Sequence, residues 1–225
     1  MRISLKTAPA LLLVLFPATA CATGSGAERQ QTPQVAIAVN RSSVTDTTPN
    51  AQRAYTAADI EFMSGMISHH AQAIVMSRWA PSHGASPSML ILTERIINAQ
   101  QDEIAAMQRW LRDRNQPVPE ARATGMRMMM NGVEHDMLMP GMLSEDQMKQ
   151  LDQARGKEFD RLFLTFMIQH HRGAVTMVDQ LFATSGAAQD ITVFKMASDI
   201  TADQTTEIER MQKMLASTIF QPDAR

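Results

Sequence analysis

The feature that most constrains the fold is a fifteen-residue stretch that occurs twice, at an offset of 101 residues. Residues 62–76 read FMSGMISHHAQAIVM, and residues 163–177 read FLTFMIQHHRGAVTM. Both histidines recur in register, as do the first phenylalanine, the central Met-Ile pair, an alanine and the last methionine. Four of the six histidines of the chain lie in these two copies. We therefore interpret the protein as two copies of one structural unit.

A second, weaker repeat indicates that this unit is a helical hairpin. Apolar residues spaced by three and four positions line one face of a helix, and the repeat has this spacing. Each unit thus combines one helix that carries adjacent histidines with one helix that carries Gln and Glu. Five positions recur at an offset of 104 residues: Gln100, Glu103, Ile104, Met107 and Gln108 become Gln204, Glu207, Ile208, Met211 and Gln212.

Helix start signals agree with this interpretation. Capping boxes begin at Thr56 and Ser144, and Pro87 occupies the first helical position after Ser86. No segment has the alternating pattern that we would expect of a strand. The start signals and the apolar periodicity predict helices over about 56–79, 87–113, 144–154, 157–184 and 188–217.

The predicted fold is all-α, a ferritin-like four-helix bundle built from two repeated helical hairpins with a long Met-rich crossover. We expect the bundle domain to span residues 55–218. Its repeats lie at about 56–113 and 157–217, and the crossover lies at about 114–156.

The start of the chain has the pattern of a secretory signal over residues 1–20. A positive segment with Arg2 and Lys6 precedes a short apolar run, and Ala18-Thr19-Ala20 forms a cleavage site. The only cysteine, Cys21, follows directly. Lipidation of Cys21 would anchor the protein to a membrane, although the same site suits ordinary cleavage. Either way the sequence predicts an exported protein, periplasmic or a membrane-anchored lipoprotein.

Residues 21–54 are rich in Thr, Ser, Gln, Ala, Asn and Pro and show no sustained period, so we expect a flexible tether. The charges nearly balance, with 21 basic and 23 acidic residues, which argues against a nucleic-acid partner. The sequence contains no nucleophile–base triad pattern, phosphate loop, Cys-x-x-Cys or dinucleotide fingerprint. It gives no indication of a protein partner.

The paired histidines fall on the buried halves of their helices, at 100° per residue. Their partner helices direct Gln100, Glu103, Gln204 and Glu207 toward the same interior. Buried polar groups are costly unless they are satisfied, so these side chains must bond to one another or to a ligand. One interpretation is a hydrogen-bond network that fixes the register of the helices. The other is a metal ion.

Adjacent histidines diverge around a helix, so we expect each imidazole to share an ion with a methionine one turn away or with another helix. Imidazole and thioether ligands suit Cu(I), and iron or manganese is the less favoured choice. We expect Gln100, Glu103, Gln204 and Glu207 to hold the ligands in place. The candidate metal ligands are His69, His70, Met66, Met76, His170, His171, Met167 and Met177.

The crossover contains a separate methionine cluster in a segment punctuated by Gly and Pro. Metal binding and simple packing over the bundle are both open interpretations, because Met is also an adaptable core filler. We expect His83 to be exposed in a turn, and Trp79 and Trp110 to be packing residues. The residues of this second candidate metal cluster are Met128, Met130, His135, Met137, Met139 and Met142.

The two repeats together resemble a bacterial family called domain of unknown function 305. The similar residues are Met66-Ile67-x-His69-His70 and the run from Gly141 through His170-His171 to Met177, within a match over about 57–216. The resemblance implies a ferritin-like bundle in a secreted or periplasmic protein, and some members are Met/His-rich copper-binding proteins tied to copper tolerance. Gly65 and Ser68 differ from Phe166 and Gln169, so the two halves need not be equivalent.

Three functions are therefore considered. The leading hypothesis is an exported protein, not an enzyme, that sequesters Cu(I) or hands it on. The second is a ferritin-like di-iron or manganese enzyme that uses the four paired histidines with Glu103 and Glu207. Against it, we expect Glu103 to lie nearer the level of Met63 than of His70. The third is a structural or partner-binding bundle with a satisfied polar core.

Overall fold

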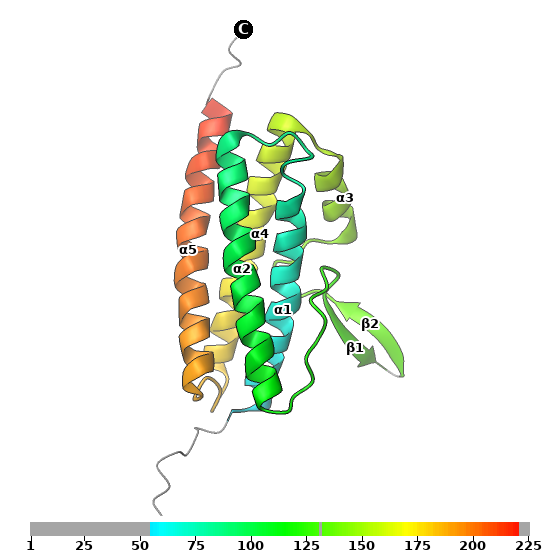
Figure 1. Cartoon of the computed structure of the whole chain (residues 1–225), viewed down its shortest axis with the longest axis vertical. Helices are drawn as coiled ribbons and strands as arrows, with labels where there is room; N and C mark the ends of the chain where they lie inside the picture. The colour runs from blue at the N-terminus through cyan, green and yellow to red at the C-terminus, as the bar shows by residue number, and fades with distance from the viewer. Residues whose placement is uncertain (1–54, 131, 221–225) are drawn as a thin grey trace, which may run out of the picture. The chain divides into compact units, whose positions relative to one another are not determined.

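The computed structural model describes residues 55–130 and 132–220. Its elements are α1 (Ala57–Arg78), α2 (Pro87–Asp113), β1 (Met126–Met130), β2 (Val133–Met137), α3 (Glu145–Gln153), α4 (Gly156–Ala183) and α5 (Ile191–Phe220). The four long helices run side by side, and the segment between α2 and α4 carries the small hairpin and α3 (Figure 1). The all-α prediction is confirmed. The expected signal peptide, Cys21 and nearly all of the tether lie outside the described residues.

The predicted capping residues begin the helices. Thr56 and Asp59 form a reciprocal capping box at α1, and Ser144 and Gln147 form one at α3. Asp59 is fully buried, and its second oxygen accepts a hydrogen bond from the Ala188 backbone at 2.7 Å. This bond ties the start of α1 to the turn between α4 and α5.

The last helix begins at Ile191, a few residues later than predicted. Ala188 adopts a left-handed φ of 54°, which cannot continue a helix. Asp190 then accepts hydrogen bonds from the backbone of Thr192 and Val193, as a helix cap does. The same carboxylate binds Trp110 on α2 and Arg114 directly after it, so this cap also joins the two hairpins.

Two sequence expectations about the connections are wrong. Strands Met126–Met130 and Val133–Met137 pair as an antiparallel hairpin in which Met128 lies opposite His135. The overlooked signal is Asn131-Gly132, a dipeptide that favours tight hairpin turns, and Gly132 has φ 78°. His83 is only 4% exposed, because its ring lies against Trp79 and Phe159 and its Nε2 donates to the Asp152 carbonyl at 2.9 Å.

The core of the bundle forms two apolar clusters at its two ends. One includes Phe62, Met66 and Met177, and the other includes Met76 and Met167. The layer between them contains the paired histidines and the Gln and Glu residues that recur in the two repeats. None of the helices within the described ranges is both long and apolar enough to cross a bilayer.

Candidate metal centre

The two histidine pairs meet in the middle of the bundle. His69 on α1 and His170 on α4 have ring centroids only 3.8 Å apart. Because α1 and α4 are antiparallel neighbours, the equivalent positions of the two repeats face each other across a pseudo-two-fold axis. All four imidazoles, those of His69, His70, His170 and His171, have 0% exposure. The sequence prediction that both pairs point inward is confirmed by this burial.

Each second histidine points to its own partner helix. Nε2 of His70 donates to Glu103 on α2 at 2.7 Å, and Nε2 of His171 donates to Glu207 on α5 at 2.8 Å. The expectation that Glu103 lies nearer the level of Met63 than of His70 is therefore wrong. His70 lies eight residues before the end of α1 and Glu103 lies sixteen residues after the start of α2. At about 1.5 Å per residue, their contact implies that α2 begins roughly 12 Å beyond the end of α1.

The layer contains many polar atoms without a partner among the described residues. Nδ1 of all four histidines has none, and Nε2 of His170 has none either. Both amide atoms of Gln100 and Oε1 of Gln204 are likewise buried without a hydrogen bond. Buried polar atoms without hydrogen bonds reduce the stability of the folded state. Their number in this one layer therefore indicates that the layer binds a ligand.

The two carboxylates fix the orientation of the rings that they contact. A histidine that donates from Nε2 keeps a free lone pair on Nδ1 and can use it to bind a metal. Carboxylate–histidine–metal arrangements have this form, because the carboxylate orients the ring and raises its basicity. Glu103 and Glu207 can therefore prepare His70 and His171 as ligands.

The two central histidines are held in the neutral form. Burial lowers the pKa of His69 well below its ordinary value, and the neighbouring His70 lowers it further. Burial and the proximity of His69 likewise lower the pKa of His170. Nε2 of His69 donates to the Pro140 carbonyl at 3.0 Å, which partly opposes the shift. Neutral imidazole is the form that binds metals.

These shifts predict that metal-free protein loses stability in mild acid. Below about pH 6.5 the unfolded chain binds protons at His69 and His170 that the folded chain does not bind. The free energy of unfolding should therefore fall with decreasing pH, by up to about 1.4 kcal/mol per pH unit for each histidine. Urea unfolding at several pH values measures this slope. The double variant H69Q/H170Q should show a shallower slope, and equal slopes would contradict the prediction.

The four candidate methionines of the repeats lie on the two sides of the histidine layer. Met66 and Met177 belong to one apolar cluster, and Met76 and Met167 belong to the other. All four are buried. The thioethers therefore divide into two sets, and each set combines one methionine from each repeat.

No three His, Cys, Asp or Glu side chains of the described segments are grouped so that they could hold one ion. Coordination by the central layer would therefore need a thioether, an amide oxygen or a rotated ring. Of these, thioethers lie closest to the histidines along the sequence, because Met66 stands one helical turn before His69.

The crossover packs directly on the histidine centre. A Cβ atom at Gly173 on α4 would lie 1.9 Å from the Pro140 carbonyl oxygen, so only glycine permits this approach. The same carbonyl accepts the hydrogen bond from His69. Gln72 on α1 fixes the next part of the segment, since it donates to the Leu143 carbonyl and accepts from the Leu143 backbone at 2.6 Å.

Sequence reasoning missed Gln72, Pro140 and Gly173. Gln72 is only 1% exposed because the crossover covers it and hydrogen-bonds to it through Leu143. A glycine within a helical pattern is a signal of close backbone approach, and Gly173 could have been recognised from it.

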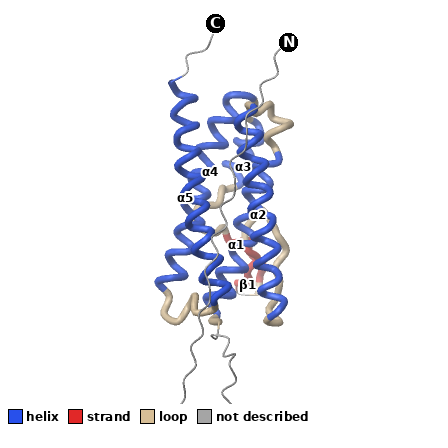
Figure 2. The backbone as a smooth tube through the Cα atoms, turned by 60° about the vertical axis from the view of Figure 1, so that its left-hand side comes forward, coloured by secondary structure: helices blue, strands red, loops and turns tan. Residues whose placement is uncertain are grey.

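The second candidate cluster is described only in part. Side chains of Met128 and Met130 lie outside what the structure describes, and His135 is exposed on β2. Met142 is buried, and its sulfur accepts the Met139 backbone N–H at 3.3 Å. Met137 and Met139 instead line a pocket together with residues of α1 and α4. Strand β1 of the hairpin lies beside α1 (Figure 2).

An acidic opening lies on the opposite side of the centre, between α2 and α5. Its lining combines Glu103, Asp203 and Glu207 with Gln100 and Gln204, and Arg95 is the basic residue among them. Burial raises the pKa of Asp203, and the nearby carboxylates of Glu103, Asp199 and Glu207 raise it further. A concentration of negative charge beside the imidazoles attracts cations.

The fold and the site together define a duplicated four-helix bundle with a buried His/Met centre. The chain belongs to the family described as domain of unknown function DUF305, whose family model matches residues 59–215. The family resemblance seen in the sequence is thereby confirmed. A comparison with curated proteins gives no match.

Solved structures of the family are similar to this chain. A DUF305 protein assigned as secreted, from Streptomyces coelicolor, has a TM-score of 0.61 and 26% identity over 75% of this chain and 98% of that chain. A DUF305 fragment from Deinococcus radiodurans has a TM-score of 0.59 and 25% identity over 72% and 98%. CopM in its Cu(I)-bound form has a TM-score of 0.54 and 27% identity over 73% and 98%. CopM structures with Cu(II) and with silver also match.

Proposed function

We propose that this is an exported protein that binds Cu(I) at its buried centre and sequesters the ion or hands it on, as a contribution to copper tolerance. One observation carries the proposal: four fully buried imidazoles leave their Nδ1 atoms without a partner in the described part of the chain. The proposed ligands are His69, His70, His170 and His171 with Met66, Met76, Met167 and Met177.

The donor set suits a soft monovalent ion. Thioethers favour Cu(I), and neutral imidazoles bind copper readily. A relative with the same fold, CopM, has been solved with Cu(I), Cu(II) and silver bound, which supports copper as the cargo here. The carboxylates of Glu103 and Glu207 would hold His70 and His171 in the binding orientation.

Export is supported by the leader-like residues 1–20 and by the similarity to a family member assigned as secreted. We propose a periplasmic location or a membrane-anchored lipoprotein, with Cys21 as the lipidated residue in the second case.

The proposal is tested by anaerobic titration of purified mature protein with Cu(I) or Ag(I) against a competing chelator. The variant in which all four paired histidines are replaced by Ala should bind at least tenfold more weakly. Circular dichroism shows whether the variant is folded, and the matched variant H83A removes a buried histidine that lies outside the centre. Equal binding by wild type and the fourfold variant would refute the proposal.

One observation favours the enzymatic alternative. Glu103 and Glu207 contact the histidines, whereas the sequence placed Glu103 away from them. Ferritin-like di-iron centres combine carboxylates with histidines in this way. Iron or manganese retained through purification, together with oxygen uptake, would support that function over copper binding. A purely structural bundle should bind none of these metals at the centre.

A further inference from the structure

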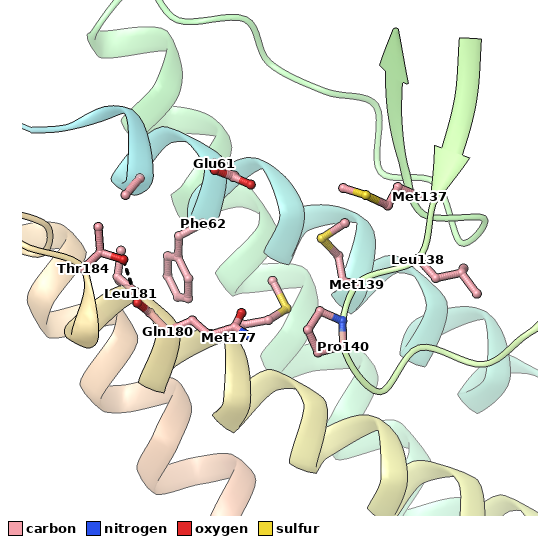
Figure 3. A pocket seen from close by; sticks show the side chains of 11 residues that line it. Glu61, Phe62, Met137, Leu138, Met139, Pro140, Met177, Gln180, Leu181 and Thr184 are labelled. Atoms are coloured by element: carbon pink, nitrogen blue, oxygen red, sulfur yellow. Dashed lines mark hydrogen bonds between the residues drawn. The ribbon is translucent and has the colours of Figure 1, made fainter. Parts of the chain in front are cut away.

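The crossover and the bundle line a half-open pocket that reaches Pro140, the residue that His69 contacts. It has a volume of ≈ 340 Å³ and lies between α1, α4 and the segment that follows β2. Three methionines line it, Met137 and Met139 from the crossover and Met177 from α4 (Figure 3). Glu61 on α1 lies at its rim. We call it the thioether pocket.

Two of these methionines, Met139 and Met177, pack at a position where the two repeats differ. Where the second repeat has Phe166, the first has Gly65. A Cβ atom at Gly65 would lie 2.9 Å from Sδ of Met139 and 3.4 Å from Cε of Met177. Both thioether side chains therefore occupy the space that a side chain at residue 65 would fill.

Packing alone does not account for all three methionines. Met177 and Met139 contact the core, but Met137 is 39% exposed and belongs to neither apolar cluster. Figure 3 shows the side chains of Met139 and Met177 pointing into the same space, with Met137 farther away beside the strands. Thioethers with one carboxylate nearby form an environment for a soft cation rather than for an apolar ligand.

We propose that the thioether pocket is a second soft-cation site, which takes Cu(I) or Ag(I) from solvent before the ion reaches the buried histidines. This proposal rests on the proposed function. Two features join the pocket to the centre: Met177 lies on the face of α4 that carries His170, and Pro140, next to Met139, accepts the hydrogen bond from His69. Met139, which would hold the ion, thus directly precedes the crossover residue that His69 contacts.

The test uses the mature full chain and the double variant M137L/M139L, since Leu nearly preserves the volume of Met. We expect one fewer Ag(I) bound per chain and at least a tenfold slower arrival of Ag(I) at the histidines, followed by histidine ring NMR signals. The matched control is M129L, which removes an exposed methionine of the same hairpin that does not line the pocket.

Methyl NMR of wild-type protein provides a measurement that does not depend on a folded variant. The methyl signals of Met137 and Met139 should respond to Ag(I) before the histidine ring signals do. Simultaneous response, or unchanged stoichiometry or rate in M137L/M139L, would overturn the proposal. If wild type binds no Ag(I), the proposed function fails as well, so the two failures are distinguishable.

Discussion

Replacing Gly173 by Ala should destabilise the protein by about 2–3 kcal/mol. The new Cβ atom would lie 1.9 Å from the Pro140 oxygen and 2.6 Å from the Gly141 Cα atom. Both contacts are with backbone, so no side chain can rotate away, and the crossover must lift off α4. His69 then loses the carbonyl that its Nε2 contacts, and the gain in helix propensity of about 1 kcal/mol offsets only part of the cost.

Thermal unfolding of the metal-free protein measures this effect, and a decrease in Tm of roughly 5–10 °C is expected for a chain of this size. Gly65→Ala is the matched control in the same layer of the bundle. Its Cβ atom meets the Met139 sulfur at 2.9 Å, and that flexible end can move. The control should therefore be neutral or slightly stabilising. Equal stability of G173A and wild type would mean that the crossover does not rest on α4.

The second large effect concerns metal-dependent stability. Cu(I) or Ag(I) bound to the folded centre should raise the Tm progressively with ion concentration, because a ligand that binds only the folded state stabilises it by mass action. The expected stabilisation is about 4 kcal/mol at a free concentration 1,000 times the Kd. Replacement of His69, His70, His170 and His171 by Ala should abolish it.

The carboxylates offer a graded version of this experiment. Glu103→Gln and Glu207→Gln preserve the shape of the side chains that accept from His70 and His171 but remove their charge. Loss of such an orienting group typically costs 10–100-fold in metal affinity. The variants should therefore need a free Ag(I) concentration that is about 10–100-fold higher to reach the same Tm. A Tm of wild type that is independent of Ag(I) would exclude the buried centre as its site.

The sequence was sufficient to predict what depends on local periodicity. The inward direction of His69 and His170 follows from the helical wheel, and the helix starts follow from Thr56, Ser144 and Pro87. It was insufficient for the axial level of Glu103, because that depends on the path of the turn after α1. It also failed for Gln72, which is buried only because a segment 71 residues later covers it.

The hairpin was missed for a different reason. Methionine is a good helix former, so β1 does not have the β-branched composition that marks a strand. Only the dipeptide Asn131-Gly132 indicated a hairpin. Next to a run of methionines, such a turn dipeptide is equally compatible with an irregular loop. The thioether pocket could not be predicted, since it depends on the contact of Met139 with Gly65 across the fold.

The separations along the chain suggest an order of folding. His70 and Glu103 are 33 residues apart and His171 and Glu207 are 36 apart, but His69 and His170 are 101 apart. Contacts that close shorter loops form sooner, so each hairpin should be established before the two halves dock. Until they dock, the histidines face water on two independent surfaces. An ion that arrives during this interval would meet a less selective chelator than the finished protein, and the order of folding and loading would then decide which metal is captured.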